Sequence, residues 1–408
     1  MVSYSTPRRV IIVNSSSIPM RLLFLSHCAP DAPDKGEKVR AYDIVRRLSV
    51  RHELHVACFA RSRQELDGLR RIEARCASLY AELLPAPRAL MRASVAFAFG
   101  GSLNEFYYRS GRMRRHVRAL AAQAPFDAAV VYTLPMAQYT PPRTPFVIDM
   151  QDVDSEKWFQ YAQRRFPGFL YRVEACRLRK REIEVARLAQ RSFFVTRAEE
   201  LLFLRLAGDV PTGYMENGWG IASHDPQQVA GLPELEGRRY IVFCGSMHYF
   251  PNVEAAAWFA ERIFPELRRR DPGLEFFIVG RNPARKVKAL AKLPGVAVTG
   301  TVPDPRPYLK DCLAAIAPLQ IARGVQMKVI EGLAMGKPVL VSPEVAATFG
   351  DQIPTGVMVC RNADEYWEAL RRGETLAPEQ IRSAVQERFD GYQNLDRLLE
   401  ELERVAAR

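Results

Sequence analysis

Cysteine and histidine are sparse and scattered in this 408-residue sequence. The seven cysteines are odd in number and lie far apart, mostly inside apolar segments, and the six histidines show no metal-ligand spacing. Cysteines distributed in this way favour reduced, buried thiols, which are typical of a cytosolic protein, over disulfides or a metal site. We therefore expect neither a bound metal ion nor a disulfide framework.

Long apolar runs are also absent. No segment reaches the roughly 18 apolar residues that span a bilayer, and the apolar core that follows Arg8 and Arg9 is too short for a secretory signal. We expect residues 1–19 to be an N-terminal extension. The first strand is not followed by a G-x-G-x-x-G fingerprint, which argues against a nicotinamide or flavin dinucleotide.

Short apolar segments alternate with helical patterns along most of the chain. In the first half, strands are predicted at 21–26, 52–59, 79–84, 127–132, 146–149 and 192–195. Two long helical stretches, 88–120 and 157–191, interrupt them. Such alternation predicts an α/β fold with a parallel, doubly wound sheet. Because the chain is too long for one core, we expect two domains, 20–221 and 239–384, separated by a polar linker at 222–238.

The stretch from Arg323 to Val341 combines a helix with a possible anion site. Gly324 is predicted to open the helix, and Gly336 with Pro338 to end it. Free amides at a helix start bind phosphate or a polar sugar group. Lys328 and Glu331 lie three residues apart and share one face of the helix. Taken alone, the pair also fits an ordinary surface salt bridge.

This string resembles the donor-site motif of retaining, family 4 glycosyltransferases of the GT-B fold, in which a glycine-led turn precedes K-x-x-E-x-x-A-x-G-x-P-V. The resemblance implies two Rossmann-like domains that face a cleft, with Glu331 accepting hydrogen bonds from the ribose hydroxyls of a nucleotide sugar. Most members carry a further glutamate eight residues before this one, where the present chain has Arg323. The role of that glutamate therefore does not transfer, and Arg323 stands as a catalytic candidate of its own.

Further loops resemble the donor side of the same family. The segment 33–40, with Lys35 and Gly36, is similar to the glycine loop that faces the donor phosphates, although it also fits a plain connecting turn. Gly245 and Ser246 belong to a G-S-M-x-Y-x-P-N pattern that lacks the commoner arginine and lysine. The resemblance implies that Lys328, Arg281, Arg323 or Lys35 neutralises the charge of the donor phosphates. It also places the nucleotide base near Val302 and Pro303. The remaining donor-site candidates are the helix-start residues Gly324, Val325 and Gln326.

Two aspartates follow a predicted strand on the other side of the cleft. Gln151-Asp152 stands where the family often has His-Asp, and Asp154 comes two residues later. Either carboxylate suits orienting or deprotonating an acceptor hydroxyl. The alternative is helix capping by Asp154 or Ser155.

The excess positive charge is confined to the first half of the chain. Residues 88–120 hold seven arginines and one glutamate, a net of +6, and residues 157–191 hold ten cations and three acids, a net of +7, against +12 for the whole chain. Aromatic residues are interleaved with these cations. The combination favours docking of the N-domain on an anionic membrane surface, or else a solvated helix face with its aromatic residues in the core.

Within the family, the chain looks most like the sugar transferases associated with PEP-CTERM/exosortase exopolysaccharide clusters. The resemblance implies transfer of a sugar, with retained configuration, from a nucleotide-sugar donor to a glycan or polyprenyl-linked acceptor, at the cytoplasmic face of the bacterial inner membrane. It implies no divalent metal or other cofactor, and a C-terminal helix, 385–408, that crosses back to the first domain. A GT-B nucleotide-sugar epimerase is one alternative. A basic nucleic-acid-binding protein is another, although no nucleic-acid motif accompanies the charge.

Overall fold

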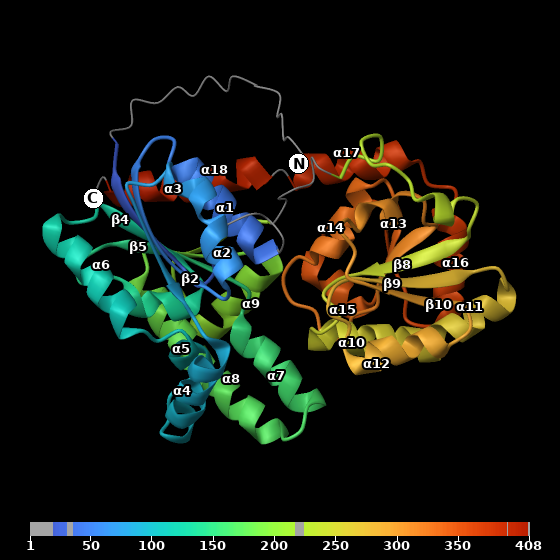
Figure 1. Cartoon of the computed structure of the whole chain (residues 1–408), viewed down its shortest axis with the longest axis horizontal. Coiled ribbons are helices and arrows are strands. Elements are labelled where there is room, and N and C mark those ends of the chain that lie inside the picture. Colours follow the sequence, from blue (N-terminus) through green and yellow to red (C-terminus); the bar gives the residue numbers. More distant parts are fainter. Residues whose placement is uncertain (1–18, 31–35, 217–223, 390, 407–408) are drawn as a thin grey trace.

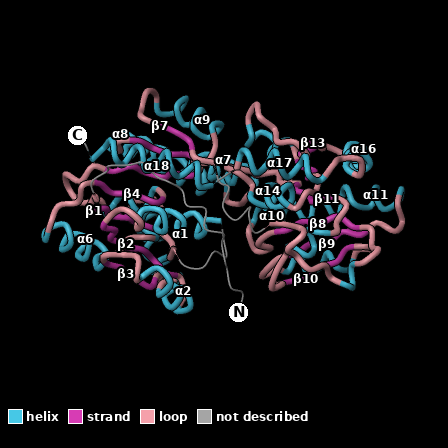
Figure 2. Tube along the Cα trace, turned by 90° about the horizontal axis from the view of Figure 1, so that it is seen from above, coloured by secondary structure: helices cyan, strands magenta, loops and turns pink. Residues whose placement is uncertain are grey.

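The computed structural model of the chain describes residues 19–30, 36–216, 224–389 and 391–406. It contains two parallel sheets with helices packed around each, in two lobes that lie side by side (Figures 1 and 2). This arrangement confirms the predicted α/β class with two doubly wound domains. Within the described ranges, no helix combines the length and the apolar character needed to cross a membrane.

The N-domain sheet has seven strands in the order β3-β2-β1-β4-β5-β6-β7. Their bounds are β1 (Arg21–Ser26), β2 (Glu53–Ala60), β3 (Ser78–Leu83), β4 (Ala128–Tyr132), β5 (Phe146–Gln151), β6 (Arg191–Phe194) and β7 (Thr212–Tyr214). The helices are α1 (Gly36–Leu48), α2 (Arg63–Gly68), α3 (Arg70–Glu73), α4 (Ala86–Ala98), α5 (Leu103–Tyr107), α6 (Gly111–Gln123), α7 (Asp154–Arg164), α8 (Gly168–Leu188) and α9 (Arg197–Ala207).

The two long helical stretches predicted in the N-domain are each broken. Residues 88–120 form α4, α5 and α6, because Gly100 adopts a positive φ of 92° and Ser102 and Ser110 then cap new helices. Residues 157–191 form the α7–α8 hairpin, which turns at Phe166 and Pro167. These breaks create compact helical projections beside the sheet.

The second sheet has six strands in the order β10-β9-β8-β11-β12-β13. Their bounds are β8 (Tyr240–Cys244), β9 (Glu275–Val279), β10 (Val296–Gly300), β11 (Ala314–Ala317), β12 (Val339–Val341) and β13 (Val357–Val359). The helices are α10 (Phe250–Trp258), α11 (Phe264–Arg270), α12 (Arg285–Ala289), α13 (Arg306–Lys310), α14 (Met327–Ala334), α15 (Pro343–Ala346), α16 (Ala363–Gly373), α17 (Pro378–Arg388) and α18 (Gly391–Ala406).

Both sheets are covered on their two faces, which explains why their strands read as continuous apolar runs. The side chains of β8, from Tyr240 to Cys244, are all buried, as are those of β4. Parallel strands in such a sheet present their carboxyl ends at one edge, where polar loop residues gather. In this chain that edge is where the two domains meet.

The C-terminal region links the domains. The sequence predicts one C-terminal helix, 385–408, but the structure has two in this region: α17 packs against α14, and α18 returns to the N-domain (Figure 1). Leu398 and Leu402 of α18 are buried in the N-domain core, and Glu401 lies 2.9 Å from Arg191. The last helix, α18, therefore packs as part of the N-domain.

Candidate functional site

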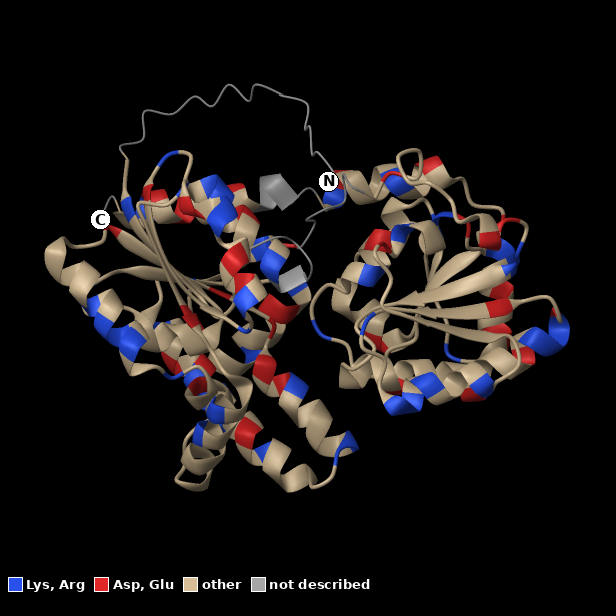
Figure 3. Ribbon diagram, in the orientation of Figure 1, with Lys and Arg blue, Asp and Glu red and all other residues tan. Residues whose placement is uncertain are grey.

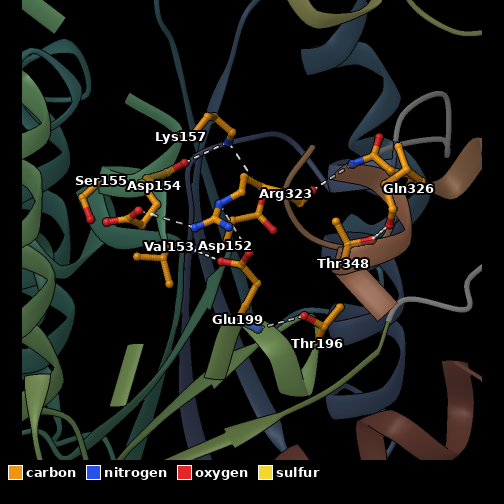
Figure 4. A network of polar contacts seen from close by, with 12 residues as sticks. Asp152, Val153, Asp154, Ser155, Lys157, Thr196, Glu199, Arg323, Gln326 and Thr348 are labelled. Atoms are coloured by element: carbon orange, nitrogen blue, oxygen red, sulfur yellow. Dashed lines mark hydrogen bonds and ion pairs between the residues drawn. The ribbon is translucent and has the colours of Figure 1, made fainter. Parts of the chain in front are cut away.

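Loops from both domains meet at the carboxyl ends of β5, β6 and β11. Gly324, after β11, approaches Asp152 so closely that a Cβ built on it would lie 2.1 Å from Asp152 Oδ1. The neighbouring Arg323 places its Nε 3.5 Å from Glu199 Oε1, on the N-domain. Figure 4 shows these side chains pointing toward one another across the junction. Asp152, Arg323 and Gly324, which the sequence nominates separately, are thus brought together.

Asp152 and Asp154 are held around one lysine. Lys157 Nζ lies 3.0 Å from Asp154 Oδ1 and 3.7 Å from Asp152 Oδ2. Burial raises the pKa of Asp152, and the charge of Lys157 opposes that rise. Burial also acts to lower the pKa of Lys157, but the two carboxylates outweigh it, so this pKa lies well above its ordinary value. The lysine therefore stays charged and anchors both aspartates.

The structure does not support the capping role for Asp154. Asp154 is the first residue of α7, the N-cap position is Val153, and no side chain makes a capping hydrogen bond there. Ser155 is instead buried and donates to Glu182, from its backbone nitrogen at 3.0 Å and from its hydroxyl at 2.6 Å. The carboxylate of Asp154 is consequently directed to Lys157.

Two carboxylates of this region were not predicted from the sequence. Burial, followed by the charge of Asp152, raises the pKa of Glu199 to about 7, while Arg323 acts against the rise. Burial likewise raises the pKa of Glu182 to about 7. The signal for Glu199 is present in the sequence as Thr196-x-x-Glu, which is typical of a capping box. Thr196 does cap α9, but Glu199 accepts a hydrogen bond from Val153 N, at 2.7 Å, and faces Arg323 of the other domain.

On the C-domain side, α14 carries the lysine and glutamate of the motif. Lys328 Nζ donates to Asn252 Oδ1 at 2.9 Å and lies 5.4 Å from the centre of the Phe243 ring. Burial lowers the pKa of Lys328 to about 8, and the charge of Glu331 works in the opposite direction. The same carboxylate contributes, after burial, to a raised pKa of Cys244 at the end of β8. Lys328 and Glu331 therefore lie together over the carboxyl end of this strand.

Glycines allow the loops after β8 and β9 to touch. Gly280 has a φ of 154°, and a Cβ on it would lie 1.7 Å from the carbonyl oxygen of Gly245. Gly245 in turn faces Asn252, whose amide donates to Ser246 O at 3.0 Å. Arg281 accepts a hydrogen bond through its carbonyl from Met247 N. These predicted donor-site loops thus form one packed unit beside Lys328.

The predicted start of α14 is wrong by three residues. Gly324 adopts a φ of 62°, which a helix does not accommodate, and the helix begins at Met327 with Gln326 at the N-cap position. The Gln326 amide donates to Arg323 O at 2.9 Å, which fixes the turn. Val325 is buried in the domain core, so only its backbone is available to a ligand.

The remaining predicted residues lie farther from this arrangement or outside it. Val302 is half-buried and Pro303 is exposed, both after β10, which is the outermost strand and is separated from β8 by β9. Gly36 is the first residue of α1. Lys35 lies outside the described residues. In the described part of the chain, no group of three or more histidine, cysteine or acidic residues is arranged to hold a metal ion.

Comparison with known proteins identifies a family domain in the second half of the chain. The sequence profile of the family described as "Glycosyl transferases group 1" matches residues 238–373. These residues form a glycosyltransferase group 1 domain. The domain contains Gly245, Arg281, Lys328 and Glu331, whereas Lys35 and Gly36, which were also nominated for the donor side, lie outside it. No curated protein sequence matches the chain.

Solved structures resemble the whole chain at low identity. HepE (Alr3699) of Anabaena in complex with UDP has a TM-score of 0.65 and 12% identity, covering 94% of this chain and 100% of its own. Sucrose-phosphate synthase of Thermosynechococcus elongatus has a TM-score of 0.68 and 13% identity, covering 95% and 99%. Trehalose 6-phosphate synthase of Burkholderia multivorans has a TM-score of 0.63 and 12% identity, covering 95% and 99%. These similarities establish the GT-B fold for the chain, and with the group 1 domain they support a glycosyltransferase.

Proposed function

We propose that the chain is a retaining glycosyltransferase that moves a sugar from a nucleotide-sugar donor to a lipid-linked oligosaccharide in exopolysaccharide synthesis. The observation that carries the proposal is the position of Lys328 and Glu331. They lie on the group 1 domain, over the end of β8, beside a loop that meets Asp152 and Glu199 of the other domain. Structures of HepE with UDP and with UDP-glucose support a nucleotide-sugar donor.

The donor side provides one contact for each polar part of such a molecule. Glu331 accepts hydrogen bonds from the ribose hydroxyls, because a carboxylate accepts two at once. Lys328 pairs with the pyrophosphate, and the amides at the start of α14 add the positive end of the helix dipole. A cation and a helix terminus are able to stabilise a leaving diphosphate without a divalent metal.

The acceptor side provides a carboxylate for the incoming hydroxyl. During transfer, the acceptor oxygen forms a bond to the anomeric carbon while the bond from that carbon to the diphosphate oxygen breaks, and the configuration is retained because the acceptor oxygen arrives on the face that the diphosphate leaves. The hydroxyl proton passes to Asp152, whose pKa is raised by burial and which is therefore a better base than an exposed aspartate. Lys157 holds Asp152 in place, and Arg323 with Glu199 joins the two domains around the reacting groups.

A panel of nucleotide sugars and nucleoside diphosphates in a thermal-shift assay tests the donor. A true donor at a hundred times its dissociation constant stabilises the folded state by about 2.7 kcal/mol. Glu331→Ala is expected to reduce this stabilisation by half or more, whereas Glu344→Ala, at an exposed carboxylate of the same domain, is a matched control that keeps it. The absence of stabilisation by any member of the panel contradicts the proposal. Incubation with the stabilising donor alone separates transfer from epimerisation, because only an epimerase releases a free epimer without acceptor.

The proposed acceptor places the enzyme at a membrane surface. We further propose that the chain is peripheral to the cytoplasmic face of the bacterial inner membrane and docks there through the N-domain. The net charge of +13 carried by residues 88–120 and 157–191 supports this orientation. The charge by itself does not identify which part of the N-domain meets the lipid.

A further inference from the structure

Large apolar side chains are exposed together at one end of the N-domain. Of the fourteen large hydrophobic residues exposed in the described chain, eight lie here, with Phe166 exposed by 96% and Phe99 by 88%. We name this group the apolar tip. It consists of Leu90, Met91, Val95 and Phe99 on and just after α4, and Phe166, Phe169, Leu170 and Val173 at the α7–α8 turn.

Polar contacts join the two halves of the apolar tip. Arg177 of α8 lies 4.4 Å from the centre of the Phe97 ring and donates to Phe97 O and Gly101 O, both at 2.7 Å. Glu174, also on α8, is fully buried and accepts hydrogen bonds from Ser102 Oγ and Leu103 N. α8 is thus clamped to the turn after α4, and Figure 1 shows α4 projecting beside the α7–α8 hairpin. The apolar side chains of the apolar tip lie outside this clamp and are exposed to solvent.

The charged residues around the apolar tip are almost all positive. Residues 86–104 and 161–180 contain eight cations and a single acid, the buried Glu174. The exposed cations are Arg88, Arg164, Arg165, Arg172 and Lys180. Figure 3 shows basic residues at the end of the α7–α8 hairpin. A second copy of the same surface would oppose cations to cations, whereas an anionic lipid surface complements both the charge and the apolar side chains.

We propose that the apolar tip inserts into the headgroup and upper acyl region of an anionic bilayer and is the membrane anchor of this protein. The reason for a membrane anchor rests on the proposed function, and the position of the anchor rests on the exposed side chains. α7 begins at Asp154 in the cleft and ends at Arg164 beside Phe166, a length of about 15 Å. A lipid-linked acceptor held near Asp152 therefore has its lipid end within reach of the bilayer that the tip enters.

Vesicle co-sedimentation of the full chain, without donor, tests the anchor. The wild type is expected to bind vesicles that contain phosphatidylglycerol, more weakly at high salt, and not purely zwitterionic vesicles. The triple variant Phe99→Ser, Phe166→Ser and Phe169→Ser should lose about a thousandfold in partitioning, because burying each phenylalanine contributes about tenfold. Leu188→Ser is the matched control, since Leu188 is 67% exposed at the opposite end of α8.

A spectroscopic readout separates insertion from loose electrostatic attachment. Cys176 is the exposed cysteine of the chain, and it lies one turn beyond Val173 on α8. A solvent-sensitive dye on Cys176 should shift to the blue when anionic vesicles are added. Arg88→Gln, Arg172→Gln and Lys180→Gln together should reduce binding by about fivefold per charge while leaving the shift of the bound fraction intact.

Three results with vesicles or with the triple variant overturn the inference. They are no binding to anionic vesicles at low salt, equal binding by the triple variant and the wild type, and a vesicle-independent dimer that the triple variant dissolves. Binding to single-stranded nucleic acid that is unaffected by vesicles also contradicts it. The nucleotide-sugar thermal shift of the triple variant should equal that of the wild type, so loss of the anchor and failure of the proposed donor site are distinguished.

Discussion

Lys328 is expected to lower the stability of the folded protein while contributing to donor binding. Its pKa is lowered by burial to about 8, from an ordinary value of 10.5, so folding disfavours the charged form. The resulting penalty is present below pH 8 and disappears as the pH rises toward the pKa of the unfolded chain. A difference of this size corresponds to about 3 kcal/mol at pH 7. The hydrogen bond from Lys328 to Asn252 offsets about 1 kcal/mol of this penalty.

Lys328→Met keeps the stem of the side chain and removes the charge. The free protein should therefore become more stable at pH 7 by about 2 kcal/mol, or roughly 4 to 8 °C in melting temperature for a domain of this size. Affinity for a nucleoside diphosphate should fall at the same time, because the ammonium that meets the pyrophosphate is gone. Differential scanning calorimetry and titration calorimetry measure the two effects separately. Lys292→Met, at an exposed lysine of the same domain, should change neither.

The pH dependence of binding provides the refuting result. A pKa near 8 leaves about nine-tenths of Lys328 protonated at pH 7 and about one-tenth at pH 9. Affinity of the wild type should accordingly fall about tenfold between these values, while Lys328→Arg, which stays charged, should show little change. Equal wild-type affinity at both pH values, or a destabilised Lys328→Met, refutes the reasoning.

Three further substitutions test the rest of the cleft. Glu331→Ala should weaken donor binding by about 1.5 to 3 kcal/mol without unfolding the protein, and unchanged affinity in titration calorimetry rejects its role. Arg323→Glu should lose donor affinity and lower the melting temperature, because it sets a carboxylate beside Glu199; a gain, or no difference from Arg323→Gln, marks Arg323 as a simple loop residue. Glu182 has a raised pKa of about 7, so its ionised form is penalised above that pH and the penalty vanishes toward pH 4.5. Glu182→Gln keeps hydrogen bonds to Ser155 and should stabilise by about 3 kcal/mol at pH 8; the same gain in chemical denaturation at pH 4.5 contradicts this cause.

Local pattern accounts for the elements that were predicted well. The strands are short apolar runs bounded by turn residues, and a strand buried on both faces carries that signal within its own sequence. The K-x-x-E spacing places Lys328 and Glu331 on one face of any helix that contains both. The start of α14 was missed because the sequence does not show whether Gly324 opens a helix or supplies a positive φ just before one.

The arrangement of the helices on either side of each break could not be predicted from the local sequence either. The stretch 157–191 is rich in helix-forming residues, and Pro167 marks a break without showing that α7 and α8 fold back on each other. The clamp from Glu174 to Ser102 joins residues that are 72 positions apart. Nothing near either residue in the sequence predicts this contact, so the apolar tip is found only when the two helical projections are placed together.

The sequence by itself determined the doubly wound class, the division into two sheets, and the donor-side motif on α14, because each depends on spacing along one element. Only the tertiary structure decided that Glu199 meets Arg323, which lies 124 residues away, and that Lys157 holds both Asp152 and Asp154. Only the tertiary structure, likewise, set the raised pKa of Glu199 and the lowered pKa of Lys328. Burial and nearby charges set these values: Arg323 of the other domain acts on Glu199, whereas Lys328 is buried within its own domain near Glu331 and Cys244.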